Sequence, residues 1–233
     1  MKGGGVMSGN KNLEEIKLKL KEVRPEDIEA ASMAIISEEM EKLGGVNIPE
    51  INLPVLKRVI HTTADFDFMN TLKFSPEDEA VTLGREALKR GVSIITDTQM
   101  AAAGMSKPSA QKFNNKIICR MAEPEIKDEA LKRGVTRSVV SIEHAVRETP
   151  DAIFAIGNAP TALIKLCELI SEGKAKPSLV IGVPVGFVNV VESKELLVEV
   201  AEKFNVPFIA AMGRKGGSPI ASTIINALFY GIK

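Results

Sequence analysis

The chain of 233 residues has few of the side chains that metal and redox sites require. It contains two histidines, two cysteines, one tyrosine and no tryptophan. Neither histidine has a second histidine or a cysteine nearby in the sequence, so we expect no transition-metal site built by the protein. Cys119 and Cys167 show no metal or redox spacing, which is typical of a protein from a reducing cytoplasm.

The chain also lacks net charge and long apolar runs. Thirty basic and thirty acidic residues cancel, so bulk charge does not indicate a nucleic-acid partner. No apolar run approaches the ~20 residues of a membrane span, and we expect no membrane partner. The glycine-rich first dozen residues have no apolar core of the signal-peptide kind. We expect residues 1–12 to form a flexible tail and residues 13–233 to form a single α/β domain.

Apolar strands alternate with amphipathic helices through most of the chain. Five short apolar runs have the length and β-branched content of buried strands. They lie at residues 92–96, 117–119, 152–156, 179–181 and 207–211. Continuous apolar strands separated by helices predict parallel pairing with both faces covered. We therefore predict a doubly wound, three-layer α/β/α domain with a mainly parallel five-stranded sheet and extra N-terminal helices.

The N-terminal segments are assigned by the residues at their ends. Pro25 and Gly44 predict the start and stop of one helix, and an apolar stripe predicts a second helix over residues 50–61. Residues 13–23 alternate between apolar and polar side chains, which predicts an edge strand, and a helix is the alternative. Ser75 followed by Pro76 predicts a helix that runs to Arg90.

One heptapeptide occurs twice. Residues 129–135 repeat residues 86–92 letter for letter. We interpret the repeat as two similar amphipathic helix ends stopped by glycine, instead of a duplication, because the residues that follow differ.

His61 is the first candidate for proton chemistry. Histidine is the only side chain whose ordinary pKa places its charge change near neutral pH. Arg58 lies one helical turn earlier. This spacing predicts that its permanent positive charge lies at the rim of the same site as His61. On the residues alone, a purely structural His61 remains the alternative. His144 lies off the apolar stripe of its helix beside Glu143, and we expect it to be exposed and without a role.

Three glycine-containing loops lead from predicted strands into helices, at residues 157–160, 182–193 and 212–218. Such loops present unpaired N–H groups and the positive end of a helix dipole, which suits carboxylates or phosphates. Lys194 adds charge to the second loop, and Arg214 and Lys215 add charge to the third. Tight strand–helix packing is the alternative for each glycine turn. No dinucleotide or phosphate-loop fingerprint is present.

Four separated segments resemble one family. They are Arg58-Val-Ile-His-Thr-Thr-Ala-Asp-Phe-Asp-Phe68, Gly157-Asn-Ala-Pro-Thr-Ala-Leu163, Gly182-Val-Pro-Val-Gly-Phe-Val188 with Glu192-Ser-Lys194, and Gly213-Arg-Lys-Gly-Gly-Ser218. In this order they resemble the precorrin-8X methylmutases, also called cobalt-precorrin-8 methylmutases, of corrin biosynthesis. The resemblance covers roughly residues 25–231.

The resemblance implies a flavodoxin-like fold and an isomerase. The reaction would move a methyl group from C11 to C12 of precorrin-8X or cobalt-precorrin-8, giving hydrogenobyrinate or cobyrinate. It would need no redox cofactor and no S-adenosylmethionine, and cobalt would be present only within the substrate. The family is typically dimeric with sites near the subunit interface, so we expect a cytoplasmic homodimer.

The resemblance also implies roles for individual residues. His61 would be the general acid that protonates the ring, and Ser32 and Arg58 match substrate-binding positions. The whole candidate substrate-binding set is Ser32, Arg58, Thr62, Arg137, Asn158, Thr161, Ser193, Lys194 and Arg214, with Arg137 donated across the dimer interface. Phe66, Phe68, Met69 and Phe187 are candidates for an apolar floor under the macrocycle. The alternative function is a non-catalytic carrier of corrinoids or other polycarboxylates on the same fold.

Overall fold

The computed structural model of the protein describes residue 17 and residues 24–232. The chain divides into two compact units, Met1–Ile35 and Ile36–Lys233. The first includes a 3-10 turn, η1 Pro25–Asp27, and the start of helix α2, Ile28–Lys42. The segment 13–23, predicted as an edge strand, lies outside the described residues except for Lys17, which is helical. The domain boundary expected after residue 12 also lies there and stays a prediction.

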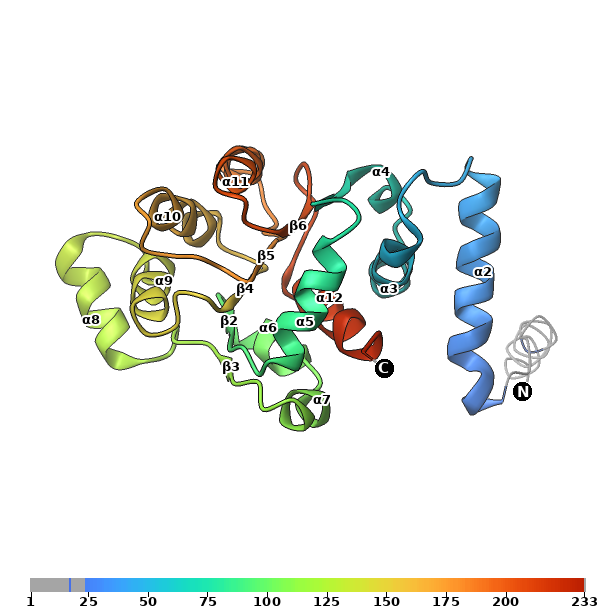
Figure 1. The fold of residues 1–233 in the computed structure, drawn as a ribbon, viewed down its shortest axis with the longest axis horizontal. Coiled ribbons are helices and arrows are strands. Elements are labelled where there is room, and N and C mark those ends of the chain that lie inside the picture. The colour runs from blue at the N-terminus through green and yellow to red at the C-terminus, as the bar shows by residue number, and fades with distance from the viewer. Residues whose placement is uncertain (1–16, 18–23, 233) are drawn as a thin grey trace, which may run out of the picture. The chain divides into compact units, whose positions relative to one another are not determined.

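A six-stranded sheet forms the centre of the second unit (Figure 1). Its strands are β1 Leu72–Ser75, β2 Ile94–Thr96, β3 Ile117–Ile118, β4 Ile153–Ile156, β5 Leu179–Gly182 and β6 Phe208–Ala211. Their order is β1-β6-β5-β4-β2-β3. The strands β2 to β6 pair in parallel, and β1 pairs antiparallel with β6. The five parallel strands are the five that the sequence predicts, in a flavodoxin-like order.

Helices cover both faces of the sheet. Their bounds are η2 Glu50–Asn52, α3 Leu53–Thr63, α4 Phe68–Thr71, α5 Ala80–Lys89, α6 Gln99–Gly104, α7 Lys107–Lys112, α8 Pro124–Arg133, α9 Arg137–Glu148, α10 Pro160–Ser171, α11 Val190–Phe204 and α12 Ser218–Tyr230. Figure 1 shows α9, α10 and α11 on one face and α5, α6 and α12 on the other. Helix α3 packs against α12. The predicted doubly wound, three-layer α/β/α architecture is confirmed.

The period-two alternation of the strands decides which side chains reach which layer. Phe154, Val180 and Phe208 lie in the core cluster shared with α9, α10 and α11. All four positions of β4, β5 and β6 are buried, which is why these strands read as continuous apolar runs in the sequence.

The sequence prediction differs from the structure around the edge strand β1. This strand is only four residues long and alternates between buried and half-buried positions, so the sequence did not indicate it. The helix predicted to start at Pro76 begins at Ala80 instead. The Ser75–Pro76 peptide bond is cis, and Pro76 O accepts hydrogen bonds from the N–H groups of Glu79 and Ala80 at 3.2 and 2.9 Å. Residues 76–79 therefore form a turn that precedes the helix. The short helices α4, α6 and α7 were also not predicted.

The repeated heptapeptide provides a matched pair for a stability test. Leu88 is fully buried on α5, a helix that packs against α12 and β5, whereas its counterpart Leu131 on α8 is 72% exposed. We expect Leu88→Ala to lower the free energy of unfolding by about 2–5 kcal/mol, because it removes buried methyl groups and leaves a cavity. Leu131→Ala should change it by less than about 0.5 kcal/mol. Urea unfolding of both variants measures this, and equal effects would contradict the assigned burial.

Candidate functional site

Asp97 ties the first glycine loop to the end of β2. It directly follows β2 and is 2% exposed. Its carboxylate accepts hydrogen bonds from the main-chain N–H groups of Gly157, Asn158 and Ala159 at 2.8, 2.8 and 2.6 Å. Burial raises the pKa of Asp97, and these three donors oppose the rise. The N–H groups predicted to be open to an anionic ligand are therefore occupied by a side chain of the protein.

Asp97 is not among the site residues predicted from the sequence. The only available signal was a carboxylate placed directly after a buried apolar strand, a position from which it faces the neighbouring loops at the carboxyl edge of a parallel sheet.

Close packing accounts for two of the loop glycines. A Cβ at Gly157 would lie 2.8 Å from Ser218 Cα, and one at Gly216 would lie 2.2 Å from Val183 O and 2.5 Å from Pro184 O. The N–H of Gly217 also donates to Val183 O at 2.8 Å. The third loop thus touches the first loop at Gly157 and the second loop at Gly216, and neither glycine has room for a side chain.

Lys194 lies on α11 inside the carboxyl edge. Its side chain is fully buried, and its Nζ donates to the carbonyl oxygens of Gly213 and Lys215 at 2.8 Å each. Burial lowers the pKa of Lys194 to about 8. The neighbouring Ser193 is also fully buried and donates to Val190 O at 2.8 Å. In this structure both side chains bond to the main chain of the protein, and their predicted contact with substrate stays a prediction.

Lys215 joins the third glycine loop to the segment that follows His61. Its Nζ lies 2.6 Å from Asp65 Oδ2 and also bonds Asp67 Oδ2. The ammonium group holds the pKa of Asp65 below its usual range. The charge of Lys215 was predicted to serve an anionic ligand, whereas in the structure Lys215 pairs with two carboxylates of the chain.

His61 lies on a groove between α3 and α12. Its ring is exposed in the last turn of α3. The groove has a volume of about 180 Å³ and is lined by Arg58, His61, Thr62, Thr223, Asn226 and Tyr230. The predicted shared rim of Arg58 and His61 is confirmed. This volume is below the ~300–1,000 Å³ of pockets that enclose small ligands, so the groove can hold only part of a large one.

Two contacts fix the walls of this groove. The Arg58 guanidinium lies 4.8 Å from the centroid of the Tyr230 ring, a cation–π distance. The hydroxyls of Thr62 and Thr223 are 2.9 Å apart and share a hydrogen bond. Both residues of the predicted set on α3, Arg58 and Thr62, therefore have partners on α12.

Hydroxyl groups gather at the first turns of α9 and α10. Thr161 Oγ1 lies 2.8 Å from Ser138 Oγ and 3.1 Å from Thr136 Oγ1. Arg137, at the start of α9, is exposed and bonds Met121 O at 3.5 Å. Asn158 is exposed on the preceding loop. This part of the predicted set lies at the carboxyl edge, and its role stays a prediction.

Arg214 and Phe187 form an exposed pair on the second and third loops. The Arg214 guanidinium lies 5.6 Å from the ring centroid of Phe187, which is 84% exposed. Phe66 and Met69 are half-buried. Phe68 is 1% exposed, so the prediction that it belongs to an apolar floor is wrong, because its ring packs into the core. Ser32 lies on α2 in the first unit, and its predicted role stays a prediction.

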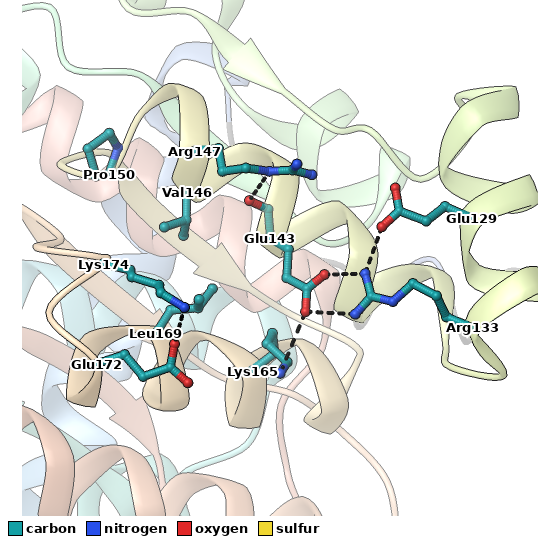
Figure 2. Close-up of a pocket in the computed structure, with 10 residues that line it drawn as sticks. All are labelled: Glu129, Arg133, Glu143, Val146, Arg147, Pro150, Lys165, Leu169, Glu172 and Lys174. Atoms are coloured by element: carbon teal, nitrogen blue, oxygen red, sulfur yellow. Dashed lines mark hydrogen bonds and ion pairs between the residues drawn. The ribbon is translucent and has the colours of Figure 1, made fainter.

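A larger cavity of about 580 Å³ lies between α8, α9 and α10 (Figure 2). Most of its charges are mutually paired: Arg133 bonds Glu129 and Glu143, and Lys165 pairs with Glu143. Arg147 donates to the main-chain oxygen of Glu143. The ion pair of Lys174 and Glu172 follows α10, at the amino end of β5. The cavity therefore lies away from the strand ends where parallel sheets bind ligands, and its paired charges leave little for a ligand to neutralise.

His144 takes part in the same network. Its Nε2 lies 2.7 Å from Glu129 Oε2, and its side chain is 19% exposed. The prediction that His144 is exposed is wrong, because the packing of α8 against α9 places Glu129 beside the ring. That His144 has no role in activity stays a prediction.

The described residues include no group of three or more histidine, cysteine or acidic side chains that could hold a metal ion. Burial raises the pKa of the Cys167 thiol to about 12, which leaves it almost entirely protonated at neutral pH. No helix in the described part of the chain has the length and apolar character needed to cross a membrane.

The lowered pKa of Lys194 predicts a pH dependence of stability. Its pKa is about 8 in the folded state, against an ordinary 10.5. Between these values the unfolded chain binds more protons than the folded one, so this group makes the unfolding free energy rise with pH. We expect wild type to gain stability relative to Lys194→Met from pH 8 to pH 10, in urea unfolding at several pH values. The control is Lys203→Met, which replaces an exposed lysine on the same helix. If the unfolding free energies of wild type and Lys194→Met changed in parallel with pH, the assignment would be contradicted.

Comparison with known proteins agrees with this architecture. The family model described as precorrin-8X methylmutase matches residues 27–231. The cobalt-precorrin-8 methylmutase of Priestia megaterium is 41% identical over 206 residues, which cover 88% of each chain. The precorrin-8X methylmutase of Pseudomonas aeruginosa is 38% identical over 198 residues, which cover 85% of this chain and 87% of that protein.

A solved structure supports the same conclusion. The precorrin-8X methyl mutase from Thermus thermophilus superposes with a TM-score of 0.77 at 36% identity, and the match covers 88% of this chain and 96% of that one. The chain therefore belongs to the precorrin-8X methylmutase family of enzymes.

Proposed function

We propose that the protein moves a methyl group from C11 to C12 of precorrin-8X or cobalt-precorrin-8 in cobalamin biosynthesis, with His61 as the general acid. The products would be hydrogenobyrinate or cobyrinate. Membership of a methylmutase family supports an isomerase of this class. The observation that carries the role of His61 is its exposed ring on the rim of the α3–α12 groove, beside Arg58 and two hydroxyls.

The proposed reaction begins with a proton. His61 donates it to the conjugated ring system of the substrate, the methyl group migrates between neighbouring carbons, and the ring returns the proton to the imidazole as the product forms. The isomerisation has no net change in atoms or electrons, so it requires no redox cofactor and no S-adenosylmethionine. A positioned general acid typically contributes about 10²–10⁴-fold to the rate.

The substrate is a broad macrocycle fringed by carboxylates, and side chains of the groove and of the glycine loops fit that chemistry. Arg58 offers a planar fork of donors to a carboxylate, and Thr62 and Thr223 add hydroxyls beside it. The exposed ring of Phe187, with Arg214 over it, offers an apolar surface next to a cation. The N–H groups of the first glycine loop are occupied by Asp97, so we assign carboxylate recognition to side chains.

We further propose that the protein acts as a cytoplasmic homodimer and that a partner subunit completes the site. The groove at His61 holds about 180 Å³, which is too small to enclose a macrocycle by itself. Arg137 is exposed at the start of α9 and is the residue that we propose to be donated across the interface.

Replacement of His61 tests the catalytic role. We expect His61→Ala to bind a corrinoid with unchanged affinity and to lose isomerisation, because the ring is exposed and its removal leaves the groove walls in place. Visible absorbance follows both binding and conversion. The matched control is His144→Ala, which removes the other histidine and should retain activity. A fully active His61→Ala would refute the general acid, and a wild-type protein that binds the substrate without converting it would favour the carrier.

Mixing two inactive variants tests the shared site. If Arg137 serves the partner's site, His61→Ala and Arg137→Ala should each be inactive as homodimers. Their heterodimers should regain activity, because one of the two sites then has both native side chains. Size-exclusion chromatography with light scattering reports the oligomeric state. A monomer in solution, or no recovery after subunit exchange, would contradict the proposal.

A further inference from the structure

We infer that Lys215 is a positioning residue for His61, and this inference rests on the proposed role of His61 in catalysis. Its ammonium group holds the segment after α3 against the third glycine loop, and the buried Lys194 holds that loop in place. Lys194 thus holds the main chain of the loop, and the side chain of Lys215 holds the carboxylates of Asp65 and Asp67.

The first link lies in the residues that end α3. Ala64 has a left-handed backbone, with φ of 51°, and its N–H donates to Ile60 O at 2.7 Å. Thr63 Oγ1 donates to Val59 O at 2.8 Å and accepts from Asp65 N at 3.3 Å. The helix end that carries His61 is therefore bonded directly to Asp65.

The second link is the carboxylate of Asp65, which faces two ways. Its Oδ1 accepts the N–H of Asp67 at 3.0 Å, and its Oδ2 lies 2.6 Å from Lys215 Nζ. Asp67 Oδ2 bonds the same ammonium group. One cation therefore holds two carboxylates that would otherwise repel each other within three residues of chain.

The third link lies beneath Lys215. Its carbonyl oxygen and that of Gly213 accept the two hydrogen bonds of Lys194 Nζ. Gly216 lies so close to Val183 O and Pro184 O that the loop cannot shift toward them. The buried Lys194 thus holds the main chain of Lys215, while the side chain of Lys215 reaches the carboxylates of Asp65 and Asp67.

The exposure of the ion pair separates positioning from stability. The side chains of Lys215 and Asp67 are 46% and 71% exposed, and ion pairs of this kind contribute little to the free energy of unfolding. Displacement of a catalytic group by about 1 Å can nevertheless cost on the order of 10²-fold in rate. We therefore expect the loss of Lys215 to change turnover far more than stability.

The test compares Lys215→Met, Lys215→Arg and Lys174→Met. Lys174 pairs with Glu172 at the opposite end of the sheet, so Lys174→Met is a matched loss of one exposed ion pair. Hydrogen–deuterium exchange of peptides over residues 60–68 provides a readout that needs no activity. We expect faster exchange there in Lys215→Met, and wild-type exchange in Lys174→Met and Lys215→Arg.

Turnover gives the second readout. We expect Lys215→Met to lower kcat on the order of tenfold with little change in KM, because the substrate still binds but the acid is displaced. Lys215→Arg should recover most of kcat. In a double-mutant cycle, Asp65→Asn with Asp67→Asn should lower kcat similarly, and adding Lys215→Met should have little further effect, since the groups act as one unit.

Two results would overturn the inference. Unchanged exchange over residues 60–68 in Lys215→Met would show that the ion pairs of Lys215 with Asp65 and Asp67 do not hold this segment. A raised KM with unchanged kcat, additive with the aspartate changes, would show that Lys215 binds substrate directly. Failure of the proposed function is distinguishable, because it appears as an inactive wild type. The exchange measurement would still show whether Lys215 holds residues 60–68.

Discussion

The buried ammonium group of Lys194 is the constraint on which the carboxyl edge of this protein depends. A buried charge is tolerated only where polar groups surround it, and Lys194 finds them in the carbonyl oxygens of Gly213 and Lys215. On the other side of the edge, the buried carboxylate of Asp97 collects three N–H groups of the first glycine loop. Charges of opposite sign thus hold two loops by opposite ends of the peptide dipole.

The glycine-rich loops were predicted to bind an anionic ligand, whereas in the structure they pack and bond with other parts of the protein. Their backbones come close because Gly157 and Gly216 have no Cβ, and much of their hydrogen-bonding capacity is used within the protein. The loops form a rigid wall, and Lys215 extends from it to the carboxylates that follow His61. A frame of this kind would suit the role that we propose for His61, because a general acid must be held in a defined place.

Much of the fold was predictable because four of the five parallel strands, β2, β4, β5 and β6, are buried at every position and are therefore continuously apolar in the sequence. The edge strand β1 was missed because one side of it is not covered, so only Leu72 and Phe74 are buried. Phe68 was misassigned because an aromatic ring reads the same in the sequence whether it faces a ligand or the core. His144 was misassigned because its partner, Glu129, lies on another helix.

Local sequence determined the order of the five parallel strands and of the longer helices between them, and the presence of one histidine and one arginine a helical turn apart. Only tertiary structure decided how the charges are used. Lys194 and Lys215 have the same side chain, yet one is buried among carbonyl oxygens and the other bridges two carboxylates. Leu88 and Leu131 occupy the same heptapeptide and differ completely in exposure. The reason is physical: helix and strand periodicity are properties of neighbouring residues, whereas burial and pairing depend on segments that are far apart in the chain.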